Sequence, residues 1–333
     1  MPLSFWPVTN QRISLARKSS STAAGRCNRS QPGNEENDRR TTMLPPFELL
    51  QPPSLDEALK MLAAGESAPL AGGTNLLPDL RAHGKAGGRF ISLAALDQLR
   101  GIEHSEHRVS MGGSTTLSDI LRDPLMPTAA PALVSMAEVF AGTMVRNAAT
   151  VAGNICYGSP SADVVPPLLS LDAEVTLVST KGERTLGLDD FLLDYKKTAR
   201  RPDELLTAVS WTPPATGTAN LFYKLGRRRG DAITVVGVAV TIVAEGNTCT
   251  KARIALGSVA PTVFRPQGAE NALIGESLTA ATIDAAAQSA AQECRPIDDI
   301  RASAEYRRHA VHMLVRRLLT QAWQTASGVN HDD

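Results

Sequence analysis

The segment Pro69–Asp79, PLAGGTNLLPD, decides how the N-terminal part of the chain is interpreted. A short apolar run, which predicts a strand, ends in the adjacent glycines Gly72 and Gly73, and a second apolar run follows after Thr74 and Asn75. Backbone N–H groups in such a bare segment are not shielded by side chains, so they can bind an anion, above all a phosphate. The alternative is a Gly-Gly turn without a ligand, since such turns commonly follow strands.

A second glycine-containing stretch lies at Ala149–Val175, with the sequence ATVAGNICYGSPSADVVPPLLSLDAEV. It predicts a strand with turns at Gly153–Asn154 and Gly158–Pro160, and Asp163 precedes an apolar, proline-rich run. An acid at this place would accept a hydrogen bond from a ligand hydroxyl, and two such turns would clamp a diphosphate from both sides. The alternative is two unrelated tight turns, with Asp163 as a helix N-cap.

Composition excludes several classes of protein. The 333 residues suggest two domains, and the 34 basic and 34 acidic residues balance, so nothing favours nucleic acid or an anionic membrane as a partner. No apolar stretch approaches the ~20 residues of a membrane span. The four cysteines form no CxxC pair or Cys/His cluster, so no disulfide framework, zinc site or iron–sulfur cluster is predicted in this chain. Sparse cysteines fit a reducing, cytoplasmic location, and Cys156 is interpreted as a small buried apolar side chain.

Residues 1–42 are rich in Ser, Arg and Asn and predict a disordered leader. This leader superficially resembles an organelle transit peptide; we favour a mis-called start, with Met43 as the true first residue. Folded sequence begins at Leu44, and the Pro/Gly/Thr-rich stretch 213–220 predicts a domain boundary. The predicted domains are 43–214, split near residue 98, and 215–326, followed by a tail at 327–333.

Local patterns predict the elements around these motifs. SLDEALKMLA predicts a helix with Ser54 as N-cap and Glu57 at the third helical position. Strands are predicted in APLAGG, GRFISLAAL, RVSMGGS and LTAVSWTP, a hairpin in AEVTLVST and GERTLGL, and helices from TTLSDIL and in PTAAPALVSMAEVF. Alternation after the boundary predicts antiparallel strands with a turn at Gly246–Asn247. Two helices follow, in TAATIDAAAQSAAQEC and ASAEYRRHAVHMLVRRLLTQAW, the second with a solvated Arg/His face over an apolar face.

Several common signatures are missing from the chain. No GxGxxG follows a strand, so a Rossmann dinucleotide site has no support. No Walker A, GxSxG or HExxH sequence occurs, and the six histidines show no ligand spacing. These absences exclude the usual sequence grounds for proposing a P-loop NTPase, a hydrolytic triad or a zinc protease.

Together, LAGGTNLLPDLR and RNAATVAGNICYGSPSADVVPPLLSLDAEV closely resemble the FAD-binding medium subunit of the molybdenum hydroxylases. That family includes xanthine dehydrogenase, carbon monoxide dehydrogenase and hydroxybenzoyl-CoA reductase. The resemblance continues in order through DDFLLDYKKTARRPDELLTAV, YKLGRRRGDAITVVGVAV, IALGSVAPTVFRPQGAE and ASAEYRRHAVHMLVRRLL. It implies an α+β fold, with a two-part FAD-binding domain of the vanillyl-alcohol-oxidase (PCMH) type at 43–214. A smaller α+β domain with an antiparallel sheet and C-terminal helices would follow at 215–326.

The resemblance also implies where FAD would bind. The first segment, Leu70–Leu77, would wrap the diphosphate with backbone amides, and Thr150–Asn154 would hold it from the other side. Asp163 would bind ribose or ribityl hydroxyls. The implied cofactor residues are Leu70, Ala71, Gly72, Gly73, Thr74, Asn75, Leu76, Leu77, Phe140, Thr150, Val151, Gly153, Asn154, Asp163, Leu206 and Lys224.

Three residues of this set lie outside the glycine segments. The resemblance implies that Phe140 lies near the isoalloxazine ring and that Leu206 and Lys224 touch the flavin; a core aromatic, a core leucine and a surface lysine are the alternatives. The chain departs from the family in two places. Asn75 stands where many relatives carry Asp, and the lack of Cys between Met43 and Cys156 leaves no ligands for the extra cluster of some relatives.

The function implied is that of an electron-transfer flavoprotein subunit with no catalytic acid or base of its own. A large partner subunit would hydroxylate the substrate at a molybdenum cofactor, and a small partner with 2Fe-2S clusters would pass electrons to FAD here and on to an acceptor. A heterotrimer or a dimer of heterotrimers is implied. Alternatives are a self-contained FAD-dependent oxidase and a scaffold subunit that has lost its cofactor. Against the oxidase, the chain lacks an obvious substrate domain. It also lacks a histidine close to the first glycine segment that could bind the flavin covalently, since His83 lies beyond Pro78.

Overall fold

A computed structural model describes residues 44–83, 88–228 and 230–328. The predicted leader at 1–42 and most of the predicted tail lie outside the described residues. Among the residues described, no helix is both long enough and apolar enough to cross a membrane.

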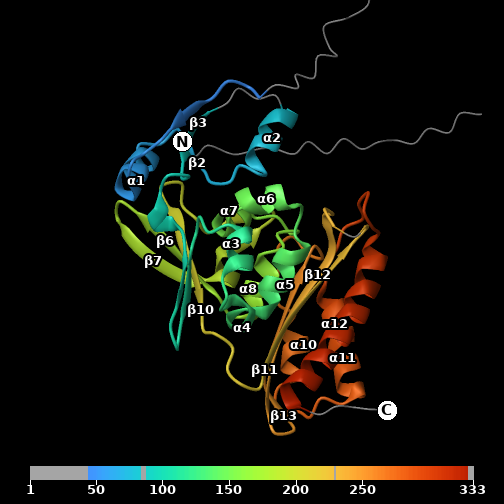
Figure 1. Cartoon of the computed structure of the whole chain (residues 1–333). Helices are drawn as coiled ribbons and strands as arrows, with labels where there is room; N and C mark the ends of the chain where they lie inside the picture. Colours follow the sequence, from blue (N-terminus) through green and yellow to red (C-terminus); the bar gives the residue numbers. More distant parts are fainter. Residues whose placement is uncertain (1–43, 84–87, 229, 329–333) are drawn as a thin grey trace, which may run out of the picture. The chain divides into compact units, whose positions relative to one another are not determined.

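The N-terminal part is a three-stranded parallel sheet with two helices (Figure 1). Its strand order is β1-β3-β2, and the helices α1 and α2 connect the strands. The elements are β1 (Glu48–Leu50), α1 (Leu55–Ala63), β2 (Ser67–Leu70), α2 (Leu76–His83) and β3 (Arg89–Ser92). The predicted cap of α1 is confirmed, because the Ser54 hydroxyl accepts a hydrogen bond from the backbone N–H of Glu57 at 3.3 Å.

The middle part is built on a five-stranded antiparallel sheet of order β4-β5-β10-β6-β7. Its strands are β4 (Ile102–His104), β5 (Val109–Gly112), β6 (Glu174–Ser179), β7 (Gly182–Gly187) and β10 (Leu205–Trp211). The predicted hairpin is confirmed, because β6 and β7 pair antiparallel from Glu174–Gly187 to Ser179–Gly182. A small hairpin of β8 (Leu192–Asp194) and β9 (Lys197–Thr198) precedes β10.

The stretch of chain between β5 and β6 forms a series of short helices. They are α3 (Leu117–Arg122), α4 (Met126–Ala129), α5 (Pro131–Val139), α6 (Thr143–Ala148), α7 (Val151–Cys156) and α8 (Val165–Ser170); a 3-10 turn (Asp97–Leu99) and α9 (Leu188–Phe191) lie outside this stretch. The prediction of a single helix over PTAAPALVSMAEVF is wrong, because the helix is interrupted at Ala130, where φ is −159°. Ala130 precedes Pro131, and the proline ring disfavours a helical conformation in the residue before it.

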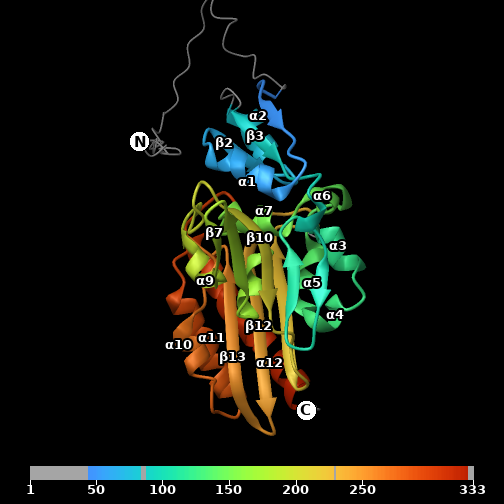
Figure 2. The ribbon, with the colours of Figure 1, turned by 90° about the vertical axis from the view of Figure 1, so that its left-hand side faces the viewer.

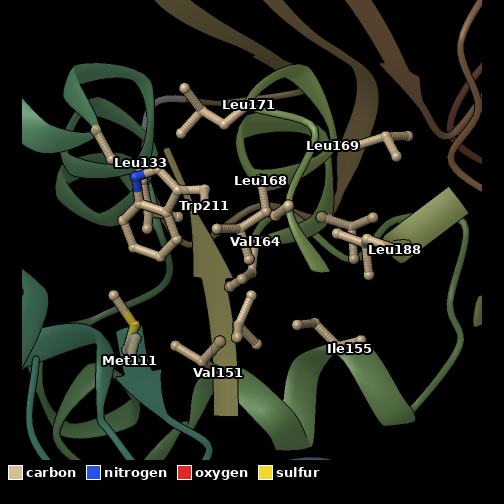
Figure 3. Packing of buried hydrophobic residues seen from close by; sticks show 14 of the residues in the cluster. Met111, Leu133, Val151, Ile155, Val164, Leu168, Leu169, Leu171, Leu188 and Trp211 are labelled. Atoms are coloured by element: carbon tan, nitrogen blue, oxygen red, sulfur yellow. The ribbon is translucent and has the colours of Figure 1, made fainter. Parts of the chain in front are cut away.

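The core of the middle part lies where α7, α8 and β10 meet (Figure 3). Val151 and Ile155 of α7 point into this core toward Val164 and Leu168. The Trp211 ring closes the core, and its indole N–H donates to the carbonyl oxygen of Ala129 at 2.9 Å. Helix α7 is therefore fixed from beneath, and its opposite face is free to form a surface.

The C-terminal part is an antiparallel sheet covered by helices on one face (Figures 1 and 2). It contains β11 (Thr218–Gly226), β12 (Thr234–Glu245), β13 (Thr248–Gly257), α10 (Gln267–Asn271), α11 (Ala280–Glu293) and α12 (Ala304–Ser327). The turn predicted at Gly246–Asn247 is confirmed, with φ of +61° at Gly246. Strand β12 is buried continuously from Thr234 to Ile242, because α12 packs on one face and α5 and α8 of the middle part lie against the sheet.

One arginine of α12 departs from the solvated face that the sequence predicts. Arg307 is buried and donates to the carbonyl oxygens of Val235 and Ser258, both at 2.8 Å, and to the carboxylate of Asp299. Burial, the largest influence, raises the pKa of Asp299, but hydrogen bonds from the backbone N–H groups of Arg301 and Ala302 and from arginine side chains lower it to about 2. Through its bond to Val235, the buried Arg307 ties α12 to the start of β12.

The predicted fold class is confirmed: an α+β chain with a two-part first domain and a smaller domain of antiparallel strands and C-terminal helices. The predicted boundary at 213–220 falls across the irregular segment 212–217 and the first residues of β11.

Candidate functional site

The first glycine segment follows strand β2, as predicted, and leads into α2, a helix that the sequence pattern did not predict. Gly73 has φ of +68°, a conformation that L-residues rarely adopt, so the turn requires glycine there. Leu70 and Leu77 close the turn from inside, 3.4 and 3.0 Å from where a Cβ on Gly73 would lie. Asn75 is exposed at the entrance to α2.

This segment carries a set of unused donors. Within the described part of the chain, the backbone N–H groups of Gly72, Gly73, Thr74 and Asn75 donate no hydrogen bond. The N–H groups of Leu77 and Asp79 do donate, to the carbonyl oxygens of Gly73 and Asn75. Successive N–H groups that lack partners attract an anion, and phosphate oxygens are suitable acceptors. Ala71 and Leu76 flank these donors at either end of the turn.

The two glycine segments lie in direct contact. A Cβ on Gly72 would lie 1.7 Å from the carbonyl oxygen of Ala148, so only glycine permits this approach. Gly153 of the second segment is exposed, and a Cβ added to it would lie 3.8 Å from the Cβ of Ala71 in the first segment. Figures 1 and 2 both place α6 and α7 facing the N-terminal sheet. The chain therefore brings together two motifs that are far apart in sequence.

The second segment is a helix, so the strand and turn predicted at Gly153–Asn154 are wrong. Thr150 is the N-cap of α7, and its hydroxyl accepts from the N–H of Gly153 at 3.1 Å. The N–H groups of Val151 and Ala152 donate to the carbonyl oxygens of Thr115 and Gly113. Because these N–H groups already donate within the chain, the segment offers a ligand a surface without side-chain bulk at Gly153 rather than a second set of anion-binding N–H groups.

Asn154 and Asp163 connect α7 to the C-terminal sheet. The side-chain oxygen of Asn154 accepts from the N–H of Val164 at 3.3 Å, which holds the residues just after Asp163. Asp163 accepts from Lys224 Nζ at 2.6 Å and from the hydroxyl of Thr234, and both side chains of the ion pair are only 8% exposed. The alternative of an N-cap is wrong, because α8 begins after Val164 without any side-chain cap.

Phe140 joins the same cluster from a third segment. Lys224 Nζ lies 5.9 Å from the centroid of the Phe140 ring, so the ring is in position for a cation–π contact. Phe140 is the C-cap of α5, Asp163 lies in the segment before α8, and Lys224 lies on β11. Their convergence was implied by the resemblance and has no local signal in the sequence.

Leu206 lies on β10 beneath α7. It is buried, and its carbonyl oxygen would lie 2.4 Å from a Cβ on Gly113. The neighbouring stretch Gly112–Thr116 supports α7 through the carbonyl oxygens of Gly113 and Thr115. Sequence reasoning treated this stretch only as a strand; its adjacent glycines were the signal that it approaches other backbone closely.

A polar latch that the sequence did not suggest joins α2 to α7. The Tyr157 hydroxyl donates to the Asp79 carboxylate at 2.9 Å, and Lys196 Nζ donates to the Tyr157 hydroxyl at 3.0 Å. Burial, the largest influence, raises the pKa of Tyr157. Tyr157 follows the second glycine segment and Asp79 follows the first, so the latch bridges the two.

The cysteines and metal-binding groups of the described residues form no centre of their own. No group of three or more His, Cys, Asp or Glu side chains in the described ranges is placed to hold a metal ion. Cys156, Cys249 and Cys294 are unpaired. Cys156 packs against the middle core, and burial raises the pKa of its thiol to about 11, as expected for a packed rather than a reactive cysteine.

Comparison with known proteins identifies two matched regions. Residues 45–211 match the family described as FAD binding domain in molybdopterin dehydrogenase, and residues 221–322 match the CO dehydrogenase flavoprotein C-terminal domain. The carbon monoxide dehydrogenase medium chain of Hydrogenophaga pseudoflava is 33% identical over 284 residues, covering 84% of this chain and 99% of that protein. The putative xanthine dehydrogenase FAD-binding subunit of Escherichia coli (strain K12) is 31% identical over 278 residues, covering 83% and 95%.

A solved structure agrees with both matches. The carbon monoxide dehydrogenase from Hydrogenophaga pseudoflava that lacks the Mo-pyranopterin moiety of the molybdenum cofactor contains a chain 32% identical to this one. The two superpose with a TM-score of 0.82 over 85% of this chain and 99% of that chain. The solved chain thus covers both matched regions of this chain in one fold. The chain belongs to the family of FAD-binding medium subunits of the molybdenum hydroxylases.

Proposed function

We propose that this chain binds one FAD and serves as the electron-transfer flavoprotein subunit of a multi-subunit molybdenum hydroxylase. The observation that carries the proposal is the set of unused N–H groups at Gly72–Asn75, held against Ala148 by an approach that only Gly72 permits. A diphosphate needs clustered donors and close backbone approach, and this segment supplies both.

The first glycine segment would hold the diphosphate of FAD. Its four N–H groups belong to consecutive residues and donate no hydrogen bond within the described part of the chain, and Gly73 gives the turn its positive φ. The second segment would form the opposite wall, with exposed Gly153 leaving room and Asn154 holding the approach to Asp163. The residues proposed to contact FAD are Leu70, Ala71, Gly72, Gly73, Thr74, Asn75, Leu76, Leu77, Phe140, Thr150, Val151, Gly153, Asn154, Asp163, Leu206 and Lys224.

The Asp163 cluster would orient the rest of the cofactor. Lys224 and Thr234 each donate to one carboxylate oxygen of Asp163, which fixes the carboxylate and leaves lone pairs for a ligand hydroxyl. Lys224 also places an opposite charge 2.6 Å from the buried carboxylate of Asp163. Phe140 would offer an aromatic surface to the ring system.

FAD would supply the redox chemistry, taking up electrons that originate at the molybdenum centre and releasing them to an external acceptor. The protein's part is to bind the cofactor, fix its position and shield it from water. No side chain described here is proposed as a catalytic acid or base.

The partners we propose are a large molybdenum-binding subunit and a small subunit with 2Fe-2S clusters, in a heterotrimer or a dimer of heterotrimers. The relatives named above are a medium chain and an FAD-binding subunit, names that denote parts of larger assemblies. We also propose domains at 43–214 and 215–326 and a cytoplasmic location, which the unpaired described cysteines support.

FAD titration of the flavin-free chain tests the binding proposal. Quenching of flavin fluorescence should saturate at one FAD per chain, and added pyrophosphate should compete, since the main donors address the diphosphate. Absence of saturable binding by correctly folded protein would leave the glycine segments as structural turns. Binding with turnover of an organic substrate by the lone chain would favour the self-contained oxidase instead.

A further inference from the structure

We propose that Arg146 is the positioning residue that holds the Phe140 ring at the flavin. The inference rests on the proposed function and adds a residue that acts through Phe140. Arg146 lies on α6, between the turn that carries Phe140 and the contact of Ala148 with Gly72.

The Arg146 guanidinium sits inside the turn between α5 and α6. Its Nη1 donates to the carbonyl oxygens of Phe140 and Ala141, at 2.8 and 2.9 Å, and Nη2 donates to the Thr143 hydroxyl at 3.2 Å. Three acceptors from one turn therefore converge on one planar group. The fork geometry of arginine suits this arrangement, and the single ammonium of lysine does not reproduce it.

The turn needs such a support because its backbone is strained. Ala141 has φ of +38°, outside the regions that an alanine ordinarily occupies. A residue held in such a conformation is strained and persists only where surrounding contacts enforce it. Gly142, Thr143 and Met144 are exposed, with Met144 at 87%, so little else packs on the outer side of the turn.

The orientation of Phe140 follows from this turn. Phe140 is the C-cap of α5, and its carbonyl oxygen is one of the two that Arg146 binds. Its ring reaches Lys224, which is paired with Asp163, so the aromatic surface and the buried ion pair have one fixed relation. Loss of the guanidinium would free the carbonyl oxygens and release the ring from Lys224.

Arg146 also links two parts of the site. Helix α6 ends at Ala148, whose carbonyl oxygen lies against Gly72 of the first glycine segment. Among the described residues, Arg146 forms no ion pair with a carboxylate, so its bonding capacity is directed to the turn. One side chain thus couples the position of the aromatic ring to the segment proposed to hold the diphosphate.

A double-mutant cycle between Arg146 and Phe140 tests the proposal. The variants Arg146→Lys, Phe140→Leu and the double variant are prepared in the full-length chain with the subunits that co-purify with it. The readouts are the FAD dissociation constant and the visible absorption spectrum of bound flavin, which reports the surroundings of the ring. Arg100→Lys is the matched control, because Arg100 also donates to a loop carbonyl, that of Ala94, at 3.0 Å and is exposed.

Arg146→Lys should weaken FAD about tenfold, the loss of one to two charge-assisted hydrogen bonds, and shift the flavin spectrum as Phe140→Leu does. In the Phe140→Leu background the lysine substitution should add little to either readout. Additive effects, or an unchanged spectrum in Arg146→Lys, would overturn the proposal.

Two further results keep the test decisive. If Arg146→Lys does not fold, the cycle is repeated in an Ala141→Gly background, because glycine removes the backbone strain that the guanidinium offsets. Additive effects of Arg146→Lys and Phe140→Leu on FAD affinity in that background would still refute the coupling. If the wild-type chain itself binds no FAD, the proposed function fails, an outcome separate from unaltered FAD binding by Arg146→Lys.

Discussion

Replacing Gly72 by alanine addresses the close approach between the two glycine segments. The added Cβ would lie 1.7 Å from the Ala148 carbonyl oxygen, whereas real Cβ contacts are essentially never under 3.0 Å. The segments would have to separate by at least 1.3 Å, the difference between the two values. Gly72 does not have a positive φ, so the change tests steric contact without backbone strain.

The magnitude follows from the cost of forcing a methyl group into a packed contact, which is about 1–3 kcal/mol. If the separation moves the donors of Gly72–Asn75 away from the opposite wall, this cost falls on FAD binding. At ~1.4 kcal/mol per factor of ten, the dissociation constant should rise about 5- to 150-fold.

The assay is FAD titration of Gly72→Ala by fluorescence quenching, with thermal unfolding of the same preparation. Gly88→Ala is the matched control, because a Cβ there meets nothing within 4 Å and no positive φ is involved. A dissociation constant equal to that of the wild-type chain, in a folded variant, would refute the reasoning.

Three further predictions concern polar groups. Asp163→Ala should lower the free energy of unfolding by about 3–5 kcal/mol, because it leaves the buried charge of Lys224 without its partner. Adding Lys224→Met should restore stability but not FAD affinity. Denaturant unfolding measures both effects, and an Asp163→Ala variant as stable as wild type would oppose the prediction. Tyr157→Phe should weaken FAD roughly fivefold through loss of about 1 kcal/mol from the bond to Asp79, measured by titration; unchanged affinity would contradict a role for the latch. The pKa of Asp299 is lowered from its ordinary 3.8 to about 2, so its contribution to stability, about 2 kcal/mol, is present above pH 4 and lost as pH falls toward 2. Asp299→Asn should therefore be less stable than wild type at pH 6, and the difference should shrink as pH falls from 4 to 2; a constant difference across this range would argue against it.

Much of the fold could be predicted because its local signals are strong. The cap of α1 rests on Ser54 and Glu57, three residues apart, and the turn at Gly246 separates two long runs of β-forming residues. Where tertiary contacts override local pattern, prediction failed. The sequence of α7 contains Gly153 and suggests a turn, but Thr150 caps the helix and Val151 and Ile155 anchor it in the core.

The site was predictable in part for the same reason. The first glycine segment has a local conformational signature in Gly73, so its turn could be foreseen. The pairing of Asp163 with Lys224 spans 61 residues and has no local pattern, so only the family resemblance brought them together. Arg146 and Tyr157 escaped attention because their partners are a turn carbonyl and a distant carboxylate, which sequence spacing does not reveal.

The most direct test of the central claim is the cofactor content of the purified chain with its co-purifying subunits. The account predicts an absorption spectrum with flavin bands at one FAD per chain, together with iron and molybdenum on elemental analysis. Flavin without metals, with turnover by the single chain, would contradict the multi-subunit hydroxylase. Correctly folded protein without flavin would contradict the FAD site itself.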